Sequence, residues 1–279
     1  MSDNKGHHFV PQIPTRQWAR ADGRVQAWRR KKEGAIWSIW QHPKEVMEEN
    51  HLYRLDHVPS GEAQKIEHKF SELETKAGEV LKVMTQRGGG GLTEQQMIDW
   101  SVFVLAQRAR VPNRIAQVKH HVREGIEELL GRDDPEFNRA KGDLPYRNLK
   151  EFAADRTPSV LANAHLRVLM SVIGNVDNLE RMLSMVWSVC DLTGGHSVIL
   201  GDDPVTLIGS LHQEDCIIAL PIAPRSVFFA ASNHDIMQRV QRYDVRKIAP
   251  NINHNQASQA QRVVVGDVEP GFLDKRMPR

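Results

Sequence analysis

The sequence predicts an α+β fold in which strands near both ends of the chain flank a helical bundle. Two short β-branched or aromatic runs, 25–28 and 35–40, are joined by a polar turn that contains glycine, as in a β-hairpin. Between residues 60 and 86, apolar side chains recur every three or four positions, which is typical of an amphipathic helix. Short strand-like runs follow between residues 197 and 231. We therefore expect the N-terminal hairpin and the C-terminal antiparallel strands to form one sheet, with the helical bundle inserted between them.

We expect a single domain, 1–279, with three parts: a hairpin region at 1–42, a helical region at 43–193, and strands with terminal helices at 194–279. In the helical region, Ser60 is the expected N-cap of the first helix, and a run of glycines from 88 to 91 ends it. Further helices are expected from Thr93, as the N-cap, to Arg108, at 112–130, at 159–191 with a bend at Gly174, at 233–240 and at 254–264. The expected C-terminal strands are 197–200, 205–208, 216–221 and 226–231.

Composition and the start of the chain indicate the class of protein. Of the 279 residues, 40% are hydrophobic and 26% are charged, as in an ordinary globular protein. No run reaches the roughly 18 apolar residues of a membrane span, and no apolar stretch follows Met1–Lys5 as a secretory signal requires. Cys190 and Cys216, the only cysteines, are then expected to stay reduced. We expect a soluble, cytoplasmic protein with no membrane partner.

The net charge of +2 is unevenly distributed along the chain. Between Arg16 and Lys32 there are seven basic residues and one acidic residue. Basic residues interleaved with tryptophans such as Trp18 and Trp28 are typical of surfaces that contact nucleic acids. A solvated hairpin with positive tips explains the same charges, so a nucleic acid is only one alternative partner.

Standard chemical motifs are absent, which leaves polar clusters at the edges of elements as candidate sites. The sequence has no glycine-rich phosphate loop, no paired-cysteine zinc motif and no serine nucleophile elbow. Asp202 and Asp203 follow an expected strand, where a carboxylate can ligate a metal or orient an imidazole, although aspartates also open turns. No cofactor is assigned, and a divalent metal stays an open alternative.

Two glutamates and an arginine form a further candidate group. Glu67 and Glu74 are seven residues apart and so lie on one flank of the first long helix. They either face solvent or point into a shared cavity. Arg110 is a potential salt-bridge partner for one of them, and such a pair organises structure as readily as catalysis.

The segment His8-Phe9-Val10-Pro11-Gln12 resembles the opening of the bacterial family called domain of unknown function 4238, which begins His-Tyr-Val-Pro-Gln. Later landmarks resemble that family in the same order: Glu67 and Glu74, Gln107 with Arg110-Val111-Pro112, Gly201-Asp202-Asp203-Pro204-Val205, and Asn253 with Ala260 and Arg262. Leu200-Gly201 replaces a Thr-Ser pair of the family, and Asp203 replaces its asparagine. The resemblance covers nearly the whole chain and implies a shared fold and a shared polar site. It implies no activity, because none is assigned to the family.

The resemblance also selects between two adjacent histidines. Neighbouring residues on an extended segment point to opposite sides, so only one of His7 and His8 is expected to face the fold. His8 is the one in fixed register with Pro11 and Gln12 of the family pattern. We therefore expect His8 to face the fold and His7 to be a bystander.

Two hypotheses of function follow. The first is a hydrolase, with a phosphodiesterase or nuclease as the finer expectation, in which His8 is a general base or metal ligand and Asp202 orients it or shares the metal. Its expected binding residues are Gln12, Glu67, Arg110, Asp203, Asn253 and Arg262. The second is a non-catalytic structural or interaction module, in which the same polar residues form a buried network that pins the N-terminus to the sheet. The sequence leaves both open, so whether the protein is an enzyme is undecided.

Overall fold

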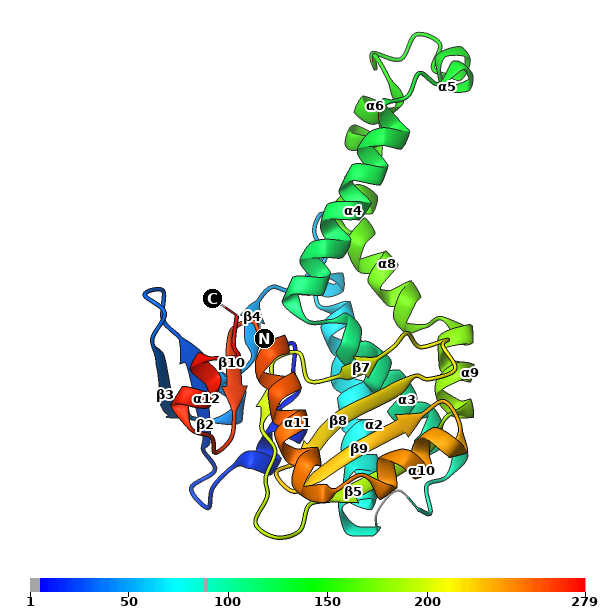
Figure 1. The fold of residues 1–279 in the computed structure, drawn as a ribbon. Helices are drawn as coiled ribbons and strands as arrows, with labels where there is room; N and C mark the ends of the chain where they lie inside the picture. The colour runs from blue at the N-terminus through cyan, green and yellow to red at the C-terminus, as the bar shows by residue number, and fades with distance from the viewer. Residues whose placement is uncertain (1–5, 88–89, 279) are drawn as a thin grey trace.

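The computed structural model describes residues 6–87 and 90–278 and shows an α+β body from which a helical arm projects (Figure 1). Residues 1–5, on which the expectation of no secretory signal rests, lie outside the described residues, as do Gly88 and Gly89 of the glycine run and Arg279. The body contains two four-stranded sheets and one two-stranded sheet. In the described part of the chain, no helix is long and apolar enough to cross a membrane. The expected α+β class is confirmed.

The N-terminal hairpin shares a sheet with strands from the other end of the chain. Strands β2 (Val25–Arg30) and β3 (Ile36–Gln41) form the hairpin. On its other edge β2 pairs with β10 (Val263–Val265), which pairs in turn with β6 (Leu200–Gly201). All of these pairings are antiparallel, so the hairpin does share a sheet with C-terminal strands.

The other C-terminal strands form a second antiparallel sheet of their own. Its order is β5 (Val186–Asp191), β9 (Ser226–Ala231), β8 (Ile217–Ala223) and β7 (Thr206–Ile208). The expectation of one sheet is therefore wrong for β7, β8 and β9, which lie in this separate sheet. Every residue of β9 is buried, and alternate side chains of the strand pack into separate cores on the two faces of the sheet. A strand that is covered on both faces has a continuous apolar sequence rather than an alternating one.

Helices cover both faces of this second sheet (Figure 1). The cores place α2 (Lys65–Arg87) and α3 (Glu94–Ala109) on one face, and α10 (His234–Arg242) and α11 (Val245–Gln259) on the other. Because α11 also contacts β6, it lies between the two sheets and can hold both of them.

The arm leaves the body at α4 (Pro112–Gly131), which packs against α8 (Ala164–Ile173). The short helices α5 (Pro135–Ala140) and α6 (Leu149–Arg156) lie toward its far end (Figure 1). Proline at the first position of α4 suits a helix start, because its missing N–H would have no partner there. The base of the arm therefore lies against the body, where α4 begins.

The start of α3 is formed by the predicted cap. The Thr93 hydroxyl accepts the backbone N–H of Gln96 at 3.2 Å, and the Gln96 side chain accepts the N–H of Thr93 at 2.9 Å, which is a capping box. The expected role of Ser60 is wrong. It lies in a 3-10 turn, η3 (Ser60–Glu62), and α2 begins only at Lys65.

Two expected helices are wrong at their C-terminal ends. The run 159–191 divides into α7 (Pro158–Ala162), α8 and α9 (Val176–Ser184), with the expected bend at Gly174, and then becomes strand β5. The expected helix 254–264 also begins earlier, at Val245, and it ends at Gln259; Val263–Val265 form β10. Both C-terminal errors have one cause: β-branched and aromatic residues fit a pleated surface with strand neighbours, and those neighbours are distant in sequence.

The remaining elements are short. They are β1 (Gly6–His8), paired with β4 (Glu48–Asn50), together with α1 (Gln12–Thr15), η1 (Arg16–Trp18), η2 (Pro43–Glu45) and α12 (Pro270–Asp274). Of the expected strand 197–200, only Leu200 belongs to a strand. Cys190 and Cys216 are both free.

Candidate functional site

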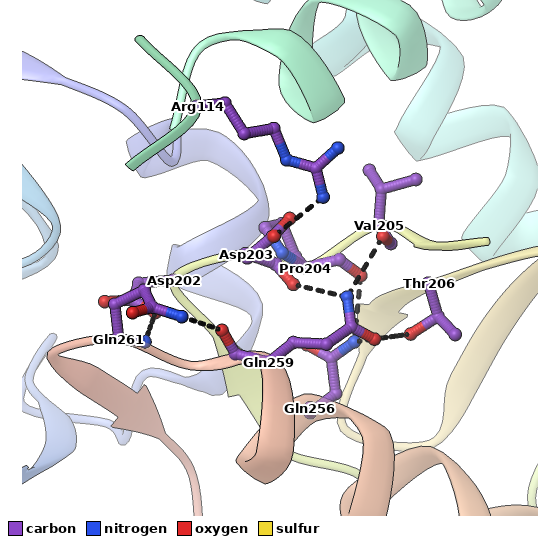
Figure 2. Close-up of polar contacts among 9 residues, drawn as sticks. All are labelled: Arg114, Asp202, Asp203, Pro204, Val205, Thr206, Gln256, Gln259 and Gln261. Carbon is purple, nitrogen blue, oxygen red and sulfur yellow. Dashed lines mark hydrogen bonds and ion pairs between the residues drawn. The ribbon is translucent and has the colours of Figure 1, made fainter. Parts of the chain in front are cut away.

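The acidic turn, Asp202–Pro204, connects β6 to β7 and lies beside the start of β10 (Figure 2). The Asp202 side chain is 3% exposed. One carboxylate oxygen accepts the backbone N–H of Gln261 at 2.8 Å, and the other accepts those of Arg262 at 2.8 Å and Val263 at 3.1 Å. Burial raises the pKa of Asp202 to about 6, against the lowering effect of these three N–H groups. Its carboxylate therefore closes the turn onto the backbone that enters β10.

Asp203, the second acid of the turn, points to the base of the arm. One of its carboxylate oxygens accepts a hydrogen bond from the Arg114 guanidinium of α4 at 2.8 Å (Figure 2). Its other oxygen is buried and has no hydrogen-bond partner. The pair is part-buried, with 29% of the Arg114 side chain exposed and 15% of that of Asp203. The acidic turn is thus bound to the arm as well as to β10.

Two glutamines of α11 hold the backbone on either side of the turn. Gln256 donates to the carbonyl of Pro204 at 2.8 Å and accepts the N–H of Gly201 at 2.9 Å. Gln259 accepts the Thr206 hydroxyl at 2.8 Å (Figure 2). The sequence reasoning missed both residues. Their spacing of three, which places them on one face of a helix, is the signal that could have found them.

Asn253 and Arg262, two of the expected binding residues, also make internal contacts. Asn253 accepts the N–H of Ile199 at 2.9 Å and donates to the carbonyl of Ser197 at 3.0 Å. The Arg262 guanidinium pairs with Glu49 of β4 at 2.6 Å. The contacts of Asn253 fix the segment before β6. The ion pair of Arg262 joins the β3–β2–β10–β6 sheet to the small β1–β4 sheet.

The expected direction of the two N-terminal histidines is wrong. His7 is fully buried, whereas His8 is partly exposed and its Nε2 bonds to the carbonyl of Lys44 at 3.0 Å. His7 Nδ1 accepts the N–H of Tyr53 at 2.9 Å, so its proton belongs on Nε2, which bonds to Gln64 at 2.8 Å. The physical reason is the pairing of β1 with β4, which turns His7 toward Tyr53.

The N-terminal network, formed by His7, Tyr53, Glu74, Gln107 and Arg110, continues from this histidine. The Tyr53 hydroxyl donates to the carbonyl of Arg110 at 3.0 Å. Arg110, which is 1% exposed, donates to Glu74 at 2.8 Å and to Gln107 at 3.0 Å. Gln107 in turn donates to the carbonyl of Phe9 at 2.8 Å. The expected salt bridge of Arg110 is therefore confirmed, with Glu74 as its partner.

Glu67 lies beside this network on α2, as expected from its spacing to Glu74. One of its carboxylate oxygens is buried without a hydrogen-bond partner. Burial and the charge of Glu74 raise the pKa of Glu67 to about 7, although the charge of Arg110 opposes them. Glu67 is thus a carboxyl group that gains and loses its proton near neutral pH.

The expected catalytic pair is not joined by a contact. The hydrogen bonds of His8 and Asp202 go to different backbone segments, 44 and 261–263. Gln12 of α1 accepts a hydrogen bond from Arg16, the first residue of η1. Over residues 6–87 and 90–278, no group of three or more histidine, cysteine, aspartate or glutamate side chains is arranged to hold a metal ion.

Several basic side chains of the Arg16–Lys32 segment have internal partners. The Arg20 guanidinium lies 3.6 Å from the centre of the Trp40 ring. Arg29 donates to Gln41 at 2.6 Å, and Arg30 pairs with Asp274 at 2.7 Å. These contacts fit the solvated-hairpin interpretation, and a nucleic-acid partner stays a prediction.

An open cleft adjoins the acidic turn where the arm meets the body. This polar cleft has a volume of about 480 Å³, and both aspartates of the turn, Arg114, Gln117 and Arg262 are among its lining residues. It lies at the N-terminus of α4, where helical N–H groups lack internal partners. The expected site residues Asp202, Asp203 and Arg262 thus all line this cleft.

A family described as "Protein of unknown function (DUF4238)" matches residues 6–269 of the chain. The chain belongs to this family. The resemblance seen in the sequence is thereby confirmed. No curated protein and no solved structure matches the chain.

The landmarks of the DUF4238 chain fall into two groups in space. Gln107, Arg110 and Glu74 belong to the N-terminal network, whereas Asp202 and Asn253 fix the backbone around β6 and β10. Within the described ranges no hydrogen bond or ion pair joins the two groups directly. Gln107 of α3 is bonded to residue 9 and Arg114 of α4 to Asp203, so α3 and α4 connect them. The family description carries no activity, and the function must be argued from these contacts.

Proposed function

We propose that the protein is a non-catalytic binding module in which the landmark polar residues hold the fold. The observation that carries this proposal is the Asp202 carboxylate, which accepts three backbone N–H groups from Gln261, Arg262 and Val263. A carboxylate has about four acceptor positions. Backbone N–H groups occupy three of these positions in Asp202. Its carboxylate therefore holds the turn closed, and only about one acceptor position is left to orient an imidazole or bind a metal.

The second support is the burial of the N-terminal network. His7, Gln107 and Arg110 are each at most 1% exposed. A buried charge is tolerated when it is paired and hydrogen-bonded. The guanidinium of Arg110 meets this condition, because it is bonded to both Glu74 and Gln107. Such a network lacks the access to substrate that catalysis needs, whereas it ties residues 7–9 to α2 and α3.

The hydrolase hypothesis stays a prediction without geometric support. A general base must lie within hydrogen-bond reach, or one water, of the proton that it removes, and a group that orients the base must be in hydrogen-bond contact with it. His8 and Asp202 instead bond to Lys44 and to the segment 261–263. The polar cleft adjoins a second, mostly apolar cavity, and the two share Arg114 and Gln117, which is the kind of concave site that a small-molecule ligand occupies.

The proposal is tested by urea unfolding of Asp202→Asn and His8→Ala, the two members of the expected catalytic pair. Asparagine offers only one acceptor oxygen and turns an amino group toward backbone N–H donors, so Asp202→Asn is expected to lose about 2–4 kcal/mol of unfolding free energy. His8→Ala is expected to change it by less than about 0.5 kcal/mol. Active-site residues commonly cost stability, so an Asp202→Asn variant at least as stable as the wild type would contradict the proposal.

A further inference from the structure

A cavity of about 610 Å³ lies at the base of the arm, between α3, α4, α8 and β7. Its apolar lining includes Val104, Val118, Val168, Val172, Leu207 and Ile218. Its size lies within the range of about 300–1,000 Å³ that is usual for small-molecule sites. Val168 and Val172 of α8 are 41% and 49% exposed, so the apolar wall reaches the surface of the molecule.

One arginine in this wall has no partner. Arg108 of α3 is half-buried and lines the cavity, and no hydrogen bond or ion pair involves its guanidinium anywhere in residues 6–87 and 90–278. Burial, followed by the nearby charge of Arg114, lowers the pKa of Arg108, although the charges of Asp203 and Cys216 oppose this shift. A partly desolvated cation beside a like charge costs free energy, and an anion placed between them would offset that cost.

The charges around the cavity are not balanced from within. Arg108 and Arg114 contribute two positive charges, and Asp203, which is bonded to Arg114 at 2.8 Å, contributes one negative charge. Arg114 and Gln117 line both this cavity and the polar cleft. The excess positive charge therefore lies where the apolar cavity adjoins the polar cleft.

We propose that this cavity binds an anionic amphiphile, a small molecule with one acidic headgroup and an apolar chain. The headgroup, a carboxylate or a phosphate, pairs with Arg108, whose planar guanidinium suits two-point contact with either. The chain lies among the valines of α4 and α8. The inference rests on the proposed binding role and gives that role a ligand class and a site.

The test is isothermal titration calorimetry of the full chain with monomeric dodecanoate, dodecyl phosphate and dodecyltrimethylammonium. Both anions are expected to bind at least about tenfold more tightly than the cation, and the tighter anion identifies the headgroup. Arg108→Gln is expected to weaken the anions by at least about tenfold. Arg123→Gln, which removes an exposed arginine of α4 outside the cavity lining, is the matched control and is expected to bind as the wild type does.

A second pair of variants tests the apolar part of the site. Val172→Trp fills the cavity mouth and is expected to weaken binding of either anion, whereas Val160→Trp, at a 41% exposed position outside the lining, is expected to leave it unchanged. Equal affinity for the cation, or undiminished anion binding by Arg108→Gln, would overturn the inference. Absence of binding together with a destabilised Asp202→Asn would overturn this site alone, because the stability result bears on the proposed function independently.

Discussion

At the scale of single residues, the N-terminal network pairs its buried arginine but leaves one neighbouring carboxyl group partly unsatisfied. Arg110 is bonded to Glu74, and Glu67 is the second acid on the same flank of α2. A buried oxygen of Glu67 lacks a hydrogen-bond partner, and its pKa is raised to about 7 by burial and by Glu74. The fold therefore favours the protonated form of Glu67 and resists its ionisation.

This pKa shift predicts a pH-dependent stability. The unfolded chain loses the Glu67 proton near the ordinary pKa of 4.5, whereas the folded chain keeps it up to about 7, so the unfolding free energy falls as pH rises through that window. Glu67→Gln cannot ionise and is expected to match the wild type at pH 4 and to be more stable at pH 8. Urea unfolding at both pH values measures this difference.

The control for this prediction is Glu72→Gln, which removes the charge of an exposed glutamate on the same helix. At pH 8, Glu72→Gln is not expected to raise the unfolding free energy as Glu67→Gln does. If the Glu67→Gln and wild-type stabilities changed in parallel between pH 4 and pH 8, the burial of this carboxyl group would not have the effect described.

Some contacts of single residues are predictable from the sequence and others are not. The pairing of Arg110 with a glutamate of α2 follows from helix spacing and charge, and it is correct. The side that each N-terminal histidine faces does not follow, because the alternation of a strand leaves two choices. The choice is made by β4, some forty residues later, which pairs with β1 and turns His7 inward.

At the scale of elements, the close approach of β6 to α11 explains a glycine before the acidic turn. A Cβ atom on Gly201 would lie 2.7 Å from the carbonyl oxygen of Gln256, a backbone atom that cannot easily move. The same glutamine bonds to the N–H of Gly201 through its side chain. Strand and helix are thus held together at this point by both contact and hydrogen bonding.

This contact predicts opposite effects for two glycine substitutions. Gly201→Ala is expected to lose about 1–3 kcal/mol of unfolding free energy through overpacking. Gly125→Ala, in α4 with open space around its Cβ position, is expected to gain up to about 1 kcal/mol through helix propensity. Thermal or urea unfolding compares them, and a stabilised Gly201→Ala would show that β6 and α11 are not in close contact.

The elements themselves were predictable where local signals decide. Thr93 and Gln96 form the capping box expected before α3, and β9 occupies the residues expected for it. Local signals failed at Val186–Asp191, where a helical pattern continues into a strand, and at Val263–Val265. Each of these strands depends on a partner that is distant in sequence, so no local pattern could specify it.

At the scale of the whole molecule, the two ends of the chain meet in one sheet. Strand β2 pairs with β10, and Trp28 of β2 donates its indole N–H to the carbonyl of Gly266 at 2.8 Å. We propose on this basis that the chain is one domain, with the arm as its projection. Strands expected at both ends predicted that the ends would share a sheet, but the strand that pairs with β2 overlaps an expected helix, and the site was not predictable. The meeting of Arg114 with Asp203, and of α11 with the acidic turn, depends on how the closed sheet, α4 and α11 pack together.

The structural role of Asp202 is measured by hydrogen exchange at the backbone N–H groups of Gln261, Arg262 and Val263. All three donate to its carboxylate. We expect slow exchange of these groups in the wild type and in His8→Ala, and faster exchange in Asp202→Asn. Exchange in the wild type as fast as that of an unstructured chain, or equally slow exchange in Asp202→Asn, would contradict this role.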